Sequence, residues 1–147
     1  LNGNLSIYTL KLTGTLKSPK LSFHPPFLML TPVPLGVETE ELITIIPQEF
    51  IRPSRIRVKV PELELADGTR TCPFSAKFLE GQDIVLSSDG TANELTCCIS
   101  FRSSKPMSFL GEILFMDQDE NRFLEQQTIV FLPCTRTWHC TAMIKKL

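Results

Sequence analysis

The sequence predicts an all-β fold, in which about seven short strands form the two facing sheets of a sandwich. Three observations support this prediction. Apolar and polar residues alternate with a period of two along several short segments, and prolines and glycines separate those segments. No stretch of useful length has the apolar period of an amphipathic helix. A chain of 147 residues is long enough for one domain with a buried core.

The segment from residue 19 to residue 36 contains five prolines and is the most distinctive part of the chain. Leu21 and Phe23 alternate with polar neighbours, as in a half-buried strand. Proline lacks the N–H that a strand donates to its neighbour, so it is excluded from central strands. We therefore expect an edge strand that pairs, breaks at Pro25 and Pro26, and pairs again along residues 27–30, as a first strand that changes sheets would.

The next two segments are also expected to be strands. Residues 37–46 indicate a second strand, which Pro47 is expected to end. Residues 55–60 show the clearest alternation in the chain. Their core side is expected to carry Ile56, Val58 and Val60. Their outer side is expected to carry a basic row of Arg55, Arg57 and Lys59.

The second half of the chain completes the sandwich. Further strands are expected at residues 74–79, 84–86, 93–102, 109–115 and 123–132. The last two are expected to form a hairpin around a polar loop at residues 117–121. Short strands at this spacing are typical of an immunoglobulin-like sandwich. Trp138 follows the last strand, so the Cys–Trp–Cys core of antibody domains is not expected.

The proline-rich segment also resembles a known family. Its pattern P-x-L-x-F-x-P, then L-x-L, then V-P-L-G, is carried by Pro19, Leu21, Phe23, Pro25, Leu28, Leu30, Val33, Pro34, Leu35 and Gly36. This order is similar to the opening of ASH domains (named for ASPM, SPD-2 and hydin), relatives of the major sperm protein and PapD-like immunoglobulin folds. It most resembles repeats in the tandem arrays of hydin and of cilia- and flagella-associated proteins. The resemblance returns near Phe101 and covers most of the chain.

The resemblance implies a domain organisation. Residues 17–134 would form the ASH-like sandwich, and residues 135–147 a tail that leads to a following segment. Repeats of this family often finish with a strand such as residues 6–16, where Tyr8, Leu10 and Leu12 alternate with polar residues until Gly14. Residues 1–16 are therefore either the last strand of a preceding repeat or an extra N-terminal strand of the same domain.

The resemblance also implies a function. It indicates a non-catalytic structural and protein-interaction module of a large ciliary protein with tandem ASH domains. Such a protein would lie in the cytoplasm and cytoskeleton, in the central apparatus of the axoneme of the cilium or flagellum, and would be needed for flagellar and sperm motility. The expected partners are neighbouring repeats and other axonemal proteins, with tubulin as a further candidate.

Composition limits the other possibilities. A net charge of −1 gives no general attraction to nucleic acid, and the longest apolar runs are too short to span a membrane. The chain begins without Met or a signal-peptide pattern, which indicates a piece of a longer protein. Five cysteines, an odd number, favour reduced thiols. The glycosylation sequon at Asn4 leaves a secreted or periplasmic adhesion or chaperone domain as the alternative.

No residue constellation predicts catalysis, a cofactor or a metal. Cys134, His139 and Cys140, with Cys97 or Cys98, lack the paired spacing of zinc ligands, and alternation sends the last two to opposite faces. No third group orients a Cys–His pair for nucleophilic attack. The carboxylates in the loop at residues 117–121 lack the Gly and Glu of an EF-hand, so a solvated hairpin tip is expected.

The remaining candidate site is a protein-interaction surface. The row of Arg55, Arg57 and Lys59 could contact an acidic partner such as a tubulin tail, or could be a solvated strand face whose charges discourage edge pairing. Unpaired strands can also accept a strand from a partner. The edges expected to do so are the strand at residues 21–30 and the strand that ends at Leu132.

Overall fold

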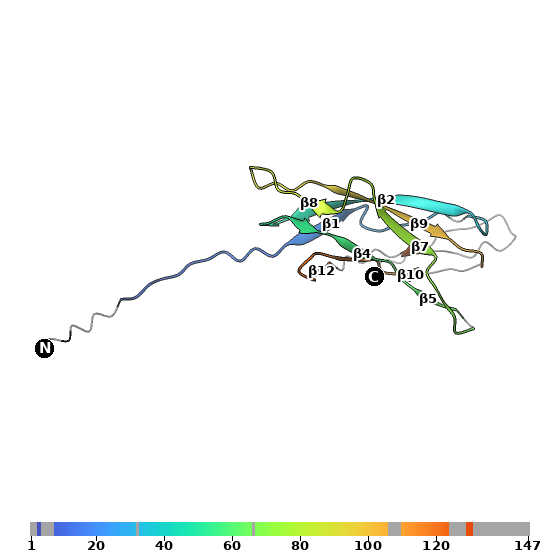
Figure 1. Ribbon diagram of the computed structural model, residues 1–147, viewed down its shortest axis with the longest axis horizontal. Helices are drawn as coiled ribbons and strands as arrows, with labels where there is room; N and C mark the ends of the chain where they lie inside the picture. Colours follow the sequence, from blue (N-terminus) through green and yellow to red (C-terminus); the bar gives the residue numbers. More distant parts are fainter. Residues whose placement is uncertain are drawn as a thin grey trace.

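The computed structural model describes residues 3, 8–31, 33–65, 67–105, 110–123 and 129–130. These residues form strands and turns, and none of them belongs to a helix that could cross a membrane. Figure 1 shows the strands gathered in one body, from which residues 8–19, here called the N-terminal arm, extend to one side. The all-β prediction is confirmed.

Four antiparallel strands make the first sheet, in the order β1-β2-β9-β7. Their bounds are Lys20–His24 for β1, Glu38–Gln48 for β2, Leu95–Arg102 for β9 and Phe74–Phe78 for β7. The two central strands pair from Glu38 opposite Arg102 to Ile45 opposite Leu95. The outer strands of this sheet are therefore β1 and β7.

Three antiparallel strands make the second sheet, in the order β12-β11-β4. Their bounds are Arg122–Phe123 for β12, Leu114–Met116 for β11 and Arg57–Lys59 for β4. Short two-stranded ladders join β3 (Ser54–Arg55) to β8 (Asp83–Ile84), β5 (Leu63–Glu64) to β6 (Arg70–Thr71), and β10 (Leu110–Gly111) to β13 (Ile129–Val130). A four-stranded and a three-stranded sheet in this chain order match a constant-type immunoglobulin sandwich.

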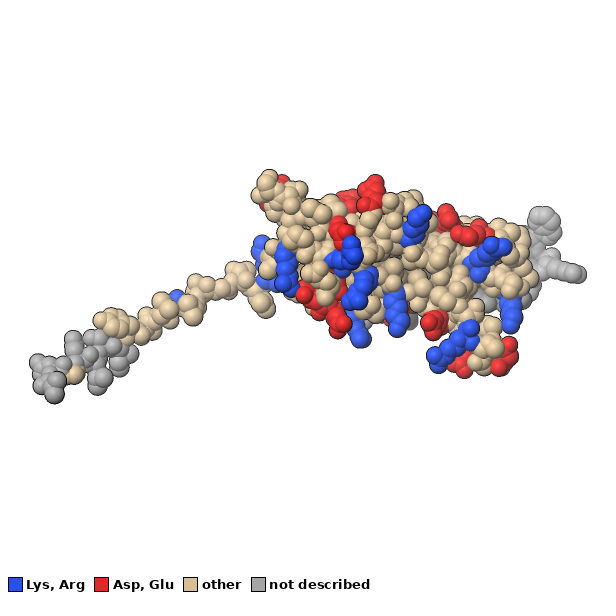
Figure 2. Space-filling view, in the orientation of Figure 1, with Lys and Arg blue, Asp and Glu red and all other residues tan. Residues whose placement is uncertain are grey.

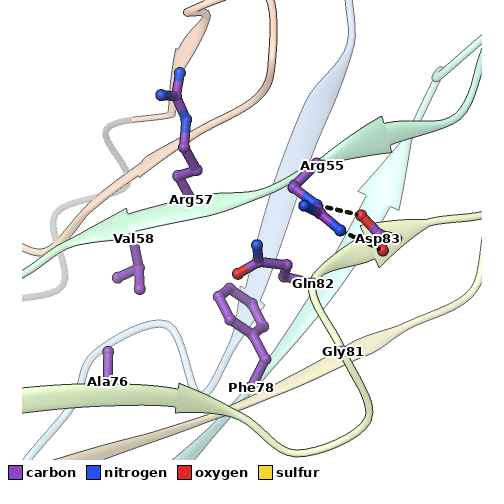
Figure 3. Close-up of a pocket in the computed structure, with 8 residues that line it drawn as sticks. All are labelled: Arg55, Arg57, Val58, Ala76, Phe78, Gly81, Gln82 and Asp83. Carbon is purple, nitrogen blue, oxygen red and sulfur yellow. Dashed lines mark hydrogen bonds and ion pairs between the residues drawn. The ribbon is translucent and has the colours of Figure 1, made fainter.

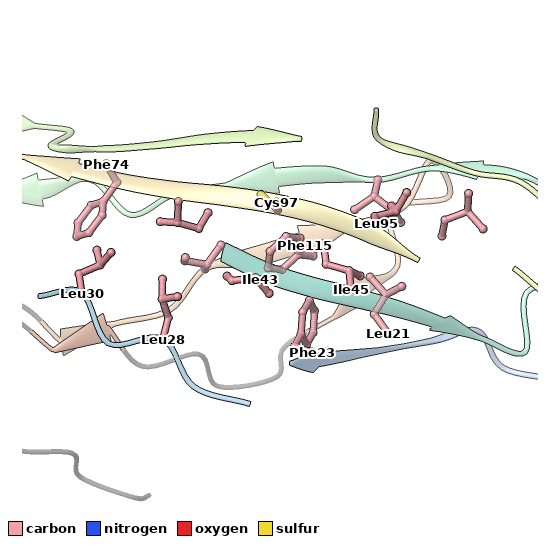
Figure 4. Packing of buried hydrophobic residues seen from close by; sticks show 14 of the residues in the cluster. Leu21, Phe23, Leu28, Leu30, Ile43, Ile45, Phe74, Leu95, Cys97 and Phe115 are labelled. Atoms are coloured by element: carbon pink, nitrogen blue, oxygen red, sulfur yellow. The ribbon is translucent and has the colours of Figure 1, made fainter. Parts of the chain in front are cut away.

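The core lies between the two sheets. Phe23 of β1 contacts Phe115 of β11 with ring centroids 4.8 Å apart, so this contact joins the sheets directly. Figure 4 shows these rings together with inward-facing side chains of β2 and β9. The fully enclosed apolar side chains include Leu30, Ile43, Ile45, Ile56, Ile84, Cys97, Ile99, Ile113 and Phe115. Burying such side chains is the main favourable contribution to folding.

The proline-rich segment enters the core without pairing a second time. After β1, residues 27–30 belong to no strand, which contradicts the predicted second pairing. Leu28 and Leu30 are nonetheless buried, whereas Phe27 and Met29 are about 40% exposed (41% and 40%). Figure 4 shows Leu28 and Leu30 projecting from this segment into the interior. The alternation in the sequence therefore reports burial and not pairing with a second strand.

The second strand passes through a proline, which corrects another prediction. β2 runs to Gln48, and Pro47 lies in it opposite Leu21 of β1. The pairing of β2 with β9 already ends at Ile45. Pro47 therefore has a neighbouring strand on one side only, and an edge position of this kind tolerates a residue that cannot donate a hydrogen bond.

The hairpin loop between β11 and β12 is not simply a solvated tip. Asp117 is 1% exposed, and its Oδ1 accepts hydrogen bonds from the backbone N–H groups of Asp119 and Asn121, each at 2.9 Å. Its Oδ2 accepts a third from Asn121 Nδ2 at 2.8 Å. Because this carboxylate closes the loop internally, its oxygens are used by the protein itself.

A groove between two sheet edges

The candidate site is a groove between β4 and β7, the outer strands of the two sheets. Each strand has a sheet neighbour on one side, β11 for β4 and β9 for β7, and no described strand pairs with either on the other side. The hollow between them has a volume of about 570 Å³. Its lining residues are Arg55, Arg57, Val58, Ala76, Phe78, Gly81, Gln82 and Asp83, which Figure 3 labels.

The floor of the groove is apolar. Val58 projects from β4, and Ala76 and Phe78 project from β7 into the space between the strands (Figure 3). All three side chains are half-buried and pack against the core. They are the inward-facing residues of their strands, left partly uncovered because both sheets end here. The groove is therefore an uncovered side of the hydrophobic core.

One end of the groove is closed by β8. Arg55 donates hydrogen bonds to both carboxylate oxygens of Asp83, from Nε at 2.8 Å and from Nη2 at 3.2 Å (Figure 3). The backbone N–H of Ile56 donates to the carbonyl of Gln82 at 2.8 Å. Beyond that bond β8 no longer runs beside the chain, so the unpaired edge of β4 begins where the ladder between β3 and β8 ends.

Backbone alternation predicts which groups face the groove. The N–H and C=O of one strand residue point to the same side, and those of the next residue point to the other side. The N–H of Ile56 points toward β8. The N–H and C=O of Val58, two residues later, should therefore point to the same side of the strand, where no described strand pairs with β4. On β7, Leu79 bonds toward β9, so the backbone groups of Ala76 and Phe78 should face the groove.

The predicted basic row is exposed as expected, but Arg55, its first member, is held in an ion pair with Asp83. Arg55, Arg57 and Lys59 are all exposed, Arg55 on β3 and the other two on β4 of the second sheet. Hydrogen bonding and charge attraction between Arg55 and Asp83 raise the pKa of the arginine and lower the pKa of the aspartate. Within the described part of the chain, neither Arg57 nor Lys59 has an ion-pair partner. Figure 2 shows Lys and Arg side chains close together over the region of β4.

Of the other candidate residues, those that the structure describes do not gather into a site. Cys97 faces the core and Cys98 the outside of β9, as alternation predicted, and burial raises the pKa of Cys97 to about 12. Cys134, His139 and Cys140 lie outside the described residues, so the metal hypothesis on them has no structural test. Among the residues that are described, no group of three His, Cys, Asp or Glu side chains could hold a metal ion.

The two predicted edge strands have different outcomes. β1 is an outer strand of the first sheet, as expected, and Leu132 lies outside the described residues. The edge at β7 was not expected. An edge at β4 was raised only through the reading of the charged row at residues 55–59 as a face that discourages edge pairing. Which strands are outermost follows from the order of pairing, and alternation within a strand carries no information about that order.

Comparisons of the sequence with known proteins match the chain to the same protein in two species. No protein-family model matches the chain. It is 47% identical over 114 residues, 78% of its length, to cilia- and flagella-associated protein 47 of Homo sapiens. It is 40% identical over 124 residues, 84% of its length, to cilia and flagella-associated protein 47 of Mus musculus. The chain spans only 4% of the length of each of these relatives.

A solved structure supports the fold. The ASH, or PapD-like, domain 7 of human CEP192 superposes with a TM-score of 0.50, covering 90% of this chain and 98% of that domain. Sequence identity between the two is 11%, so this likeness concerns the architecture alone. The shared architecture agrees with the four-plus-three strand order.

Proposed function

This chain is an ASH-type, PapD-like domain related to cilia- and flagella-associated protein 47, and from that premise we propose that it is a non-catalytic protein-interaction domain of a large ciliary protein. The observation that carries the proposal is the 47% identity to a relative named for cilia and flagella. The groove between β4 and β7 supplies a surface suited to the role, because it combines an apolar floor with two open strand edges.

The domain is proposed to be one of several in a tandem array. The N-terminal arm belongs to no described strand, and its side chains are largely solvent-exposed: Tyr8 is 90%, Leu10 81% and Leu12 85% exposed. Figure 1 shows the arm extending away from the sandwich. Alternating apolar side chains without a core of their own fit a strand completed by another domain. In this proposal residues 1–16 close a preceding repeat, 17–134 form this domain and 135–147 lead onward.

The proposed location is the axoneme of a cilium or flagellum, in the cytoplasm and cytoskeleton, and more specifically its central apparatus. The proposed partners are neighbouring repeats of the same chain and other axonemal proteins, with tubulin among the candidates. The role would be mechanical and connective, so loss of the parent protein should impair flagellar motility. The free thiols of Cys72, Cys97 and Cys98 are compatible with a reducing compartment.

The test is proximity labelling in multiciliated cells. The 147-residue chain is fused to a biotin ligase, and the biotinylated proteins of isolated axonemes are identified by mass spectrometry. We expect axonemal proteins to be enriched over a ligase-only control, with central-apparatus components among them. The same enrichment by an unrelated immunoglobulin-like domain would contradict a specific ciliary role.

A further inference from the structure

We propose that the groove binds an extended acidic segment of a partner protein, which adds to β4 as a further strand. Three successive residues of this segment would be acidic, apolar and acidic. The proposal rests on the interaction function proposed above and names the kind of partner that this surface would select. It is derived from the open edge, the side-chain order along β4 and the charge around it.

The edge of β4 is shaped to receive a strand. β8 pairs with β3 and ends at the bond from Ile56 N–H to the carbonyl of Gln82. An incoming strand would lie beside β4 on the same side on which β8 lies beside β3. There the N–H and C=O of Val58 point outward from the sheet edge, by the alternation that places those of Ile56 toward β8. Main-chain bonds of this kind give affinity in strand addition.

Side-chain register then selects the sequence of the added strand. A residue opposite Val58 has its side chain on the core side, where it would cover Val58, Ala76 and Phe78. Its two neighbours have their side chains on the outer side, next to Arg57 and Lys59. Since opposite charges at facing positions stabilise a strand pair, the preferred partner carries Asp or Glu at both.

Charge also excludes one obvious occupant and distinguishes the two edges. The N-terminal arm alternates as a strand does, but its charged residues are Lys11 and Lys17, so in another copy's groove it would bring cations to Arg57 and Lys59. On β7, Lys77 is the sole cation among the strand's five residues. Two cations flank the central residue of β4, which is why the added strand is assigned to that edge.

The experiment uses the 147-residue chain and a fluorescently labelled synthetic peptide, Thr-Val-Glu-Val-Glu-Val-Thr. Binding is measured by fluorescence anisotropy, and the contact surface is mapped by chemical shifts in two-dimensional NMR spectra. We expect saturable binding with shifts concentrated at Arg57, Val58 and Ala76. The variant Arg57→Glu/Lys59→Glu should bind at least about tenfold more weakly, because two attractive contacts become repulsive. The matched control Lys20→Glu/Arg70→Glu changes the net charge equally, away from the groove, and should bind as the wild type does.

Peptide variants separate strand addition from simple charge attraction. The peptide Thr-Glu-Glu-Val-Val-Val-Thr has the same composition without the alternation, and it should bind at least about fivefold more weakly. N-methylation of the central Val should weaken binding because that amide faces β4, whereas N-methylation of a Glu should not. If both N-methylated peptides bind alike, or if the charge-reversed protein binds as the wild type does, the added strand on β4 is wrong.

The outcome is separable from that of the proposed function. No binding of the first peptide at millimolar concentration would overturn the acidic-strand proposal, and axonemal proximity labelling would still test the ciliary role independently. Conversely, peptide binding without axonemal labelling would leave the groove specificity standing and remove the ciliary assignment. Chemical-shift changes that are largest at Lys77 and absent from Arg57 and Val58 would overturn the assignment to β4.

Discussion

Replacing Phe115 by Ala tests whether the two sheets share one core. Phe115 is 0% exposed, and its ring lies 4.8 Å from that of Phe23 in the opposite sheet. Truncating a buried Phe to Ala typically lowers the free energy of unfolding by about 3–5 kcal/mol, which is a large part of the roughly 5–15 kcal/mol of a typical domain. At about 4 °C per kcal/mol for a domain of this size, Tm should fall by about 12 °C or more.

The assay is urea and thermal unfolding followed by circular dichroism and fluorescence. Phe27→Ala is the matched control, because Phe27 is 41% exposed and should lose about 1 kcal/mol or less. A double-mutant cycle with Phe23→Leu and Phe115→Leu should give a coupling energy of about 0.5–1.5 kcal/mol for the ring pair. Equal losses for Phe115→Ala and Phe27→Ala, or strictly additive effects in the cycle, would refute a contact between the sheets.

Three further predictions concern single positions. Gly36 has a φ of 79° at the third position of a turn closed by the Val37 N–H and the Pro34 carbonyl, so Gly36→Ala should lower the free energy of unfolding by about 1–2 kcal/mol; Gly14→Ala in the arm, measured in the same urea titration, should change it little. Cys97, buried with a pKa of about 12, should resist iodoacetamide at pH 8 in the native state, whereas exposed Cys72 should be modified; peptide mass mapping that finds Cys97 modified first would contradict this. The lowered pKa of Asp83 means that its ion pair stabilises the fold above about pH 4; the stability difference between wild type and Asp83→Asn should therefore shrink as the pH falls further, and a pH-independent difference would exclude the ion pair as its cause.

Alternation predicted the faces of individual strands well. In β9, the residues expected on one side, from Leu95 to Phe101 in steps of two, are between 0% and 7% exposed. The same holds for Ile56, which is fully buried beside exposed Arg55 and Arg57. This success has a local cause, since a strand directs successive side chains to opposite faces wherever it is placed.

The errors arose where a residue's role depends on its surroundings. Pro47 was expected to end a strand, but it lies where β2 has already lost one neighbour. Asp117 was expected at a solvated tip, but three donors within its own loop allow its carboxylate to be buried. In both cases the sequence shows the residue and its chemical needs, and only the fold shows how those needs are met.

By itself, the sequence determined that this protein is a sandwich of short strands, which residues face its interior, and that a basic row lies on one outer face. These properties depend on composition, proline placement and a two-residue period, all of which act over a few neighbouring residues. Only the tertiary structure decided that β4 and β7 are both outermost, that Arg55 is paired with Asp83, and that a groove with an apolar floor separates the two edges. Pairing order joins segments distant in the chain, so the energies that fix it come from contacts that no local pattern records.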